Sequence, residues 1–379
     1  MASQSAPSNV PLSDIDNEYW NERSERRTAA LHQLKAVLKE KLGREQVPPP
    51  FWAFCQVSDI SRLEEMVFIV EQAPNAKIAQ LCLEPTIKDC DSAIVRWLQN
   101  LSAINTTSSG TDRSTTASHN CKKRDQSKCV LTGWEEPDAA HIYPHCLIKA
   151  SGREPRAVGR FWDILRFFWE EERVEQWKNE IFSDPQNLKA PKDGCFNMIS
   201  LDKHPHALWG AGRFALRPIK ISADLKELKV EFYWQPKPSH ETEEIDLLTE
   251  PATSRGLYKY GGRGLPVPTG TYKEDGEPEY RSIASGDVFS LTTDDPDKLP
   301  LPSWPLLEMQ WHLQRIAGMS GAAESSEDLD HNDDDDNAKE ITTHDRDATV
   351  RSVRAISEWL RLLPENEQST PRPRPSIPV

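Results

Sequence analysis

Apolar residues recur every three or four positions near the start of the chain, with charged residues between them. This pattern over residues 17–42 predicts an amphipathic helix, with Ser13 or Asp14 as its cap and the prolines at 48–50 beyond its end. The same period predicts shorter helices at 60–71, 76–83 and 91–101. Residues 1–102 are therefore expected to form a helical N-terminal region that packs against a partner surface and has no site of its own.

The pattern then changes twice. Residues 103–120 are rich in Ser, Thr and Asn and lack periodic apolar positions, so a flexible linker and a domain boundary are expected there. Beyond the linker, residues 121–236 read as one compact unit built on short strands. The strands are predicted at 139–143, 196–201, 213–219 and 228–234.

Aromatic residues dominate an insertion at 152–191 within this unit. They recur at helical spacing over about two helices and include Phe161, Trp162, Phe168, Trp169 and Trp177. Packing of a helical subdomain explains the spacing directly, whereas a base-stacking platform would require exposed rings beside basic residues. Core packing is the interpretation we adopt.

The last third of the chain divides into an extension and a tail. Residues 258–268 are Gly-rich but fit no phosphate-binding fingerprint, so a plain loop is expected, and a helix is predicted after Pro305. We expect 237–324 to pack on the core. Residues 325–379 contain the acidic run 333–336 and a Pro-rich end, with little to bury, so they are expected to be mostly disordered.

Charge and cysteine content limit the function classes. The net charge is −14, whereas residues 121–236 carry 19 Lys and Arg against 17 Asp and Glu; this is a weak footprint for nucleic acid. Seven Cys without a Cys-x-x-Cys pair argue against a disulfide framework and an ordinary zinc knuckle. The sequence shows neither an apolar membrane-spanning stretch nor a secretory signal, so an intracellular location is expected, nuclear or cytoplasmic. It does not define the oligomeric state.

One ordered set of polar residues indicates chemistry. His141 closes a predicted strand, Asn197 opens the next, and His206 follows that Asn by nine positions at the start of a predicted helix. Metal-assisted cleavage of a phosphodiester needs a base, a metal ion and a group that orients the base. We assign His141 as base, Asn197 as the orienting or ligating amide, and His206 as metal ligand.

These motifs resemble the HNH endonuclease family, in particular a fungal branch of uncharacterised HNH-domain proteins. The resemblance is carried by Ala-His-Ile-x-Pro at 140–144, Asn-x-Ile-x-Leu at 197–201, His206 and Arg-Phe-Ala-Leu at 213–216, with Cys-x-x-x-Gly at 129–133. It implies an α+β protein with a ββα-metal core and hydrolysis of DNA or RNA. It also implies a divalent metal ion, Mg²⁺ or Mn²⁺, with Zn²⁺ or Ni²⁺ as alternatives.

Two departures from the family pattern bear on the metal. Many members carry an acid or a His immediately before the base, where this chain has Ala140, and an Asp four residues after the helix His, where it has Gly210. His204 is our second metal-ligand candidate, with Asp202 and Asp138 as other substitutes. Two alternatives stay open: a degenerate HNH scaffold that binds without cleaving, and an HNH fold recruited to other chemistry such as small-molecule biosynthesis.

Overall fold

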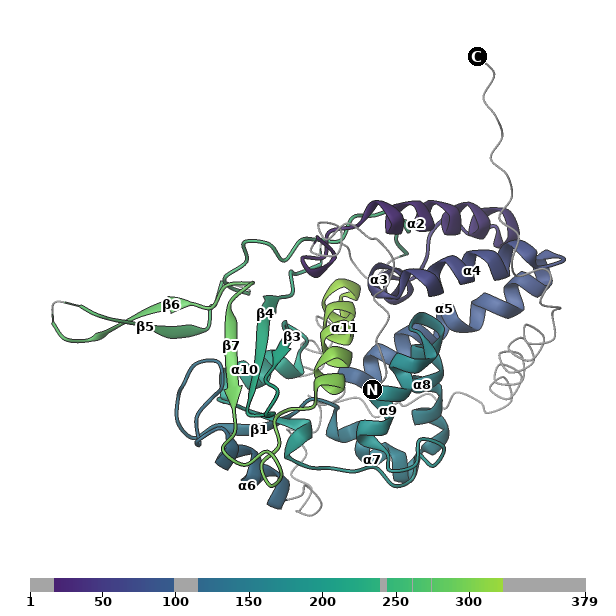
Figure 1. Ribbon diagram of the computed structural model, residues 1–379. Coiled ribbons are helices and arrows are strands. Elements are labelled where there is room, and N and C mark those ends of the chain that lie inside the picture. Colours follow the sequence, from purple (N-terminus) through teal and green to yellow (C-terminus); the bar gives the residue numbers. More distant parts are fainter. Residues whose placement is uncertain (1–16, 99–114, 239–243, 261, 274, 323–379) are drawn as a thin grey trace, which may run out of the picture.

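A computed structural model describes residues 17–98, 115–238, 244–260, 262–273 and 275–322. Most of the helices lie on one side of the molecule and three small antiparallel sheets on the other (Figure 1). The fold is α+β, as the sequence predicts. The predicted acidic tract and the Pro-rich tail lie outside the described residues. No helix within the described ranges combines the length and apolar character needed to cross a membrane.

The N-terminal layer contains four α-helices: α2 (Glu25–Val37, continued by a π-helical turn, Leu38–Leu42), α3 (Pro49–Val57), α4 (Ile60–Gln72) and α5 (Ala76–Leu98). The single helix predicted over 17–42 is wrong at residues 20–24, where the structure interrupts it. Asn21 has a φ of 63° and breaks the helix, and the Ser24 side chain caps α2 by accepting from Arg27 N. Helix α3 was missed because all nine of its residues are buried, which leaves no amphipathic period.

Helix α5 corrects a second prediction. The helices expected at 76–83 and 91–101 are one continuous helix with Pro85 inside it. An interior proline costs about 3 kcal/mol. The buried face nevertheless continues across it, because Leu83, Ile87 and Cys90 all pack into the core.

The central unit is a two-stranded ribbon with a helix on either side of it in the chain. β1 (Asp138–His141) pairs antiparallel with β2 (Met198–Leu201), so that His141 faces Met198 across the ladder. α10 (Lys203–Gly210) follows β2 directly. α6 (Thr115–Arg124) precedes the ribbon and packs on both strands.

Helix α6 shows that the predicted linker was too long. Of the predicted linker, residues 115–120 belong to this helix, and residues 103–114 lie outside the described residues. The composition of this helix is polar, but the helix has a short buried face. Ala117 and Cys121 on that face form a cluster with Cys195 and Met198. All seven cysteines are free thiols.

The insertion folds into α8 (Pro155–Phe168) and α9 (Glu171–Ile181), and α7 (His145–Arg153) leads into it. Its large rings are buried, with Trp162, Phe168, Trp169 and Trp177 each 1% exposed or less. These aromatics are therefore core, because a stacking platform would need open ring faces.

β3 (Phe214–Ile221) and β4 (Glu227–Trp234) of the central unit form a sheet of order β3-β4-β7 with β7 (Val288–Thr292) of the C-terminal extension. β5 (Pro266–Tyr272) and β6 (Pro278–Ser282) form a separate, exposed hairpin that projects from the body (Figure 1). The plain loop predicted at 258–268 is thus wrong in its last three residues, which begin β5. α11 (Trp304–Ser320) packs on α3 and β3 and joins the two halves of the molecule.

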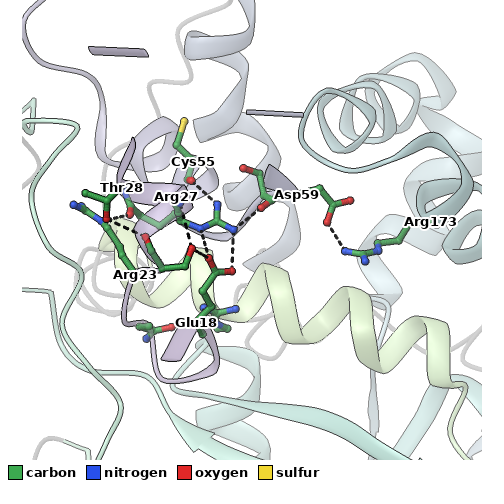
Figure 2. A network of polar contacts seen from close by, with 12 residues as sticks. Glu18, Arg23, Arg27, Thr28, Cys55, Asp59 and Arg173 are labelled. Carbon is green, nitrogen blue, oxygen red and sulfur yellow. Dashed lines mark hydrogen bonds and ion pairs between the residues drawn. The ribbon is translucent and has the colours of Figure 1, made fainter. Parts of the chain in front are cut away.

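A polar network ties the N-terminal helices together and to α11. Figure 2 shows Arg27 between the Glu18 carboxylate, at 3.1 Å, and the Cys55 carbonyl, at 3.0 Å. On α11, Arg315 Nε donates to Asn21 Oδ1 at 2.8 Å. Burial lowers the pKa of Arg315 to about 10, and the nearby Glu18 charge opposes that shift.

Candidate active site

His141 lies at the end of β1 and is 8% exposed. Its Nε2 is 3.4 Å from Asp193 Oδ2. The ring centroid lies 5.1 Å from that of His145, the first residue of α7. Trp209 on α10 donates its indole N–H to the His141 carbonyl at 2.9 Å, so the backbone that carries this imidazole is held from the helix side.

Asn197 fixes the segment that follows His141. It is fully buried. Tyr143 N donates to Asn197 Oδ1 at 2.7 Å, and Asn197 Nδ2 donates to Tyr143 O at 3.2 Å. Ile142 N also donates to the Asn197 main-chain carbonyl. A side chain with this burial and these partners locks two segments together and has no surface left for a substrate.

Asp193 is the residue that sequence reasoning missed. Burial alone raises its pKa, but the hydrogen bond and charge of His141, together with the charge of His145, outweigh that effect and hold the pKa of Asp193 below its usual range. The Asp-Gly step at 193–194 precedes the 3₁₀ turn Cys195–Asn197 that leads into β2. An acid four positions before the motif Asn was the available signal.

His206 has an acidic neighbour as well. Its Nδ1 lies 3.3 Å from Asp138 Oδ2, with the side chains 25% and 51% exposed. Asp202 begins α10 by accepting from His204 N at 2.9 Å, while Thr132 donates to its other oxygen. The structure thus brings Asp138 to His206, whereas the side chain of His204 is exposed.

The two acid and imidazole pairs lie at opposite ends of β1. Asp138 and His141 are its first and last residues, a separation of roughly 10 Å at about 3.3 Å per residue. Ala140, between them, is fully buried. The structure pairs His141 with Asp193 and His206 with Asp138, and it bonds the Asn197 side chain to Tyr143.

The donor set limits which metal site this region can form. Within the ranges that the structure describes, no group of three or more His, Cys, Asp and Glu side chains is placed to hold a metal ion. A closed protein cage of the structural zinc type is therefore not formed there. Mg²⁺ commonly takes only one or two carboxylates and completes its shell with water and phosphate oxygens. The partly exposed Asp138–His206 pair fits this second kind of site.

Comparison with known proteins agrees with the motif. A family model described as HNH endonuclease matches residues 129–217. The match begins at the turn before β1 and ends within β3, so it includes the ribbon, the aromatic insertion and α10. Searches of curated proteins and of solved structures give no match. The chain therefore carries an HNH endonuclease domain, which occupies residues 129–217.

Proposed function

We propose that this domain hydrolyses phosphodiester bonds in DNA or RNA, with His141 as general base. The observation that carries the proposal is the His141–Asp193 pair, held at the end of β1 beside a segment that Asn197 fixes. A base oriented by a partly buried acid is the arrangement that activates water or a hydroxyl in many hydrolases.

This geometry indicates which ring nitrogen of His141 accepts the proton from water. Asp193 is ionised, because its pKa lies below the usual range, and it accepts a hydrogen bond from the Nε2–H of His141. This contact fixes the tautomer and leaves Nδ1 to take the proton from water. As the imidazole becomes charged, the Asp193 carboxylate stabilises it. His141 is thus the catalytic group, and Asp193 is a positioning and electrostatic group.

Asn197 and Trp209 serve as positioning residues in this scheme. The Asn197 side chain bonds to both backbone polar groups of Tyr143, which lies two residues beyond the base. Trp209 holds the carbonyl of His141 itself. Small misplacements of a catalytic group cost orders of magnitude in rate, so locking the strand end from both sides favours catalysis.

HNH domains generally depend on a divalent metal ion, and Asp138 and His206 are the residues that would hold it here. When bound, such an ion polarises the phosphate and stabilises the leaving oxygen. Asp138 supplies the hard oxygen that Mg²⁺ or Mn²⁺ prefers.

Cleavage assays on the full chain test the proposal. Supercoiled plasmid, single-stranded DNA and RNA are incubated with Mg²⁺, Mn²⁺, Ni²⁺ or Zn²⁺. We expect cutting that falls by roughly 10²- to 10⁴-fold in His141→Ala, the range of a lost general base. His32→Ala, an exposed His on α2, is the matched control and should cut as the parent does. No cutting with any ion, or full activity in His141→Ala, contradicts the proposal.

A second candidate is a non-catalytic HNH scaffold that binds a partner. Its specific support is the distance between the two pairs along β1 and the absence of side-chain ligands at Ala140 and Gly210. Calorimetric titration of Mn²⁺ separates the two candidates. The hydrolase predicts binding that weakens in both Asp138→Asn and His206→Ala, whereas the scaffold predicts no such binding and no cutting.

A further inference from the structure

A depression of about 440 Å³ lies beside Asp138, outside the His141–Asp193 pair. It lies between the C-terminal part of α6 and the segment that enters β1. Its lining is polar and carries charges of both signs, mainly from Lys122, Lys128, Glu135, Glu136 and Asp138. The depression therefore adjoins the Asp138–His206 pair, because Asp138 belongs to both.

The two lysines come from different elements. Lys122 is in the last turns of α6, and Lys128 pairs through its backbone with Glu135 in an isolated bridge. Neither lysine forms an ion pair with a carboxylate in the described part of the chain, although many other lysines and arginines of this protein do. The same lining holds the carboxylates of Glu135, Glu136 and Asp138, but the two lysine ammonium groups form no ion pair with them and can bind phosphate oxygens of a ligand.

The rim of the depression contains unusual backbone. Gln126 and Ser127 have φ of 56°, and Glu136 has φ of 59°. These are three of the five non-glycine residues with positive φ among the described residues. Such conformations cost free energy and gather where function requires them. Here both loops that frame the depression are held in this way.

Trp134 adds an aromatic surface next to the lining residue Glu135. It is 54% exposed, and no other tryptophan in the described ranges is among the exposed large apolar residues. Tryptophan is usually well buried, and an open indole offers a face on which an unpaired base can stack. Its backbone is fixed, since Cys129 N donates to the Trp134 carbonyl at 2.8 Å.

We propose that this depression binds single-stranded nucleic acid, with Lys122 and Lys128 on the backbone phosphates and Trp134 stacked on a base. The inference rests on the proposed function and names its substrate class. A duplex fits less well, because its bases are already stacked and present no free face to Trp134.

Binding can be measured without cleavage by fluorescence anisotropy on the full chain with Ca²⁺ or EDTA present. The probes are a labelled oligothymidylate of about 12 nucleotides, within the usual site size, and a duplex of the same length. We expect tighter binding of the single strand. Trp134→Ala should weaken it roughly 5- to 150-fold, the range for one stacked base. Tyr272→Ala, an exposed aromatic on the distant hairpin, is the control.

The lysines have a separate readout. For a single strand, the slope of log affinity against log salt is about 0.7 for each phosphate that the protein neutralises. Lys122→Ala with Lys128→Ala should therefore lower the slope by roughly 1.4, whereas Lys77→Ala with Lys88→Ala on α5 should leave it unchanged. Equal affinity for duplex and single strand, or parent-like binding by the Trp134 and lysine variants, overturns the inference.

The two proposals fail in different ways. If cutting depends on His141 but the Trp134→Ala variant binds and cuts as the parent does, the hydrolase is retained and the depression is rejected as the binding site. Trp134-dependent binding of single strands without any cutting retains the binding site and rejects the hydrolase.

Discussion

The carboxamide of Asn197 occupies both backbone polar groups of Tyr143, accepting from its N–H at 2.7 Å and donating to its carbonyl at 3.2 Å. Asn197 directly precedes β2, whereas Tyr143 follows β1. A single buried side chain thus closes the open end of the ribbon, two residues beyond His141. In this chain the Asn of the motif therefore acts by holding the backbone of Tyr143.

Replacing Asn197 by Ala should therefore lower stability first. The change leaves a buried N–H and a buried carbonyl unpaired, each worth about 1–3 kcal/mol. We expect the free energy of unfolding, measured by urea titration, to fall by roughly 2–4 kcal/mol. Gln80→Ala, at an exposed position of α5, should change it by less than about 0.5 kcal/mol. A stable Asn197→Ala protein would show that the two bonds contribute little.

Asp193→Asn should act on activity and on the pH dependence of stability. The folded pKa of Asp193 is depressed, so its carboxylate stabilises the fold above the unfolded pKa of about 3.9, and this contribution is lost as pH falls through the lower folded value. The difference in Tm between parent and variant, followed downward from about pH 5, should shrink below about pH 4. A constant difference down to the acid limit would contradict the pairing with His141.

The ribbon and its helix were predictable because their signals are local. The Asn197 to His206 spacing and the capping Asp202 lie within ten residues of sequence, and the match of residues 129–217 agrees with them. Asp193 lies only four positions before Asn197, but its partner His141 is 52 positions away, and only the closed ribbon brings the two together.

Buried elements explain the other errors. Helix α3 has no polar face, and α6 has a face of only a few small side chains, so neither shows the expected periodicity. The pairing of His206 with Asp138 depends on how α10 lies over the start of β1. Residue types alone favoured His204 as the second metal ligand, with Asp202 and Asp138 as substitutes, whereas the structure pairs His206 with Asp138.

Trp209→Phe tests the support of His141 from α10. The variant keeps an aromatic ring in a site that is 2% exposed but removes the donor to the His141 carbonyl. Loss of that bond should cost about 1–3 kcal/mol and lower kcat more than it raises KM. Trp169→Phe is the matched control, since the Trp169 indole N–H is buried without a partner among the described residues. Similar effects of the two variants would assign the cost to ring volume alone.

The charge network of the N-terminal layer gives the sharpest stability test. Burial alone raises the pKa of Glu18, but the charge and hydrogen bond of Arg27 outweigh it, so this pKa lies below its usual range. Glu18→Gln preserves shape and leaves Arg27 and Arg315 without their shared counter-charge. Removing one partner of a buried pair costs about 3–5 kcal/mol, and the 26% exposure of Glu18 should reduce this to roughly 2–3 kcal/mol.

Glu22→Gln is the control for that variant, because Glu22 pairs with Arg255 at the surface, where both side chains are a third to a half exposed. Its cost should stay below about 1 kcal/mol. The cost of Glu18→Gln should also depend on pH. Because the pKa of Glu18 is depressed in the folded state, its carboxylate stabilises the fold above the unfolded pKa of about 4.3. The difference in the free energy of unfolding between parent and Glu18→Gln should therefore close as pH falls below about 4. Equal costs for the two variants would mean that water screens the Glu18 network as fully as it screens a surface pair.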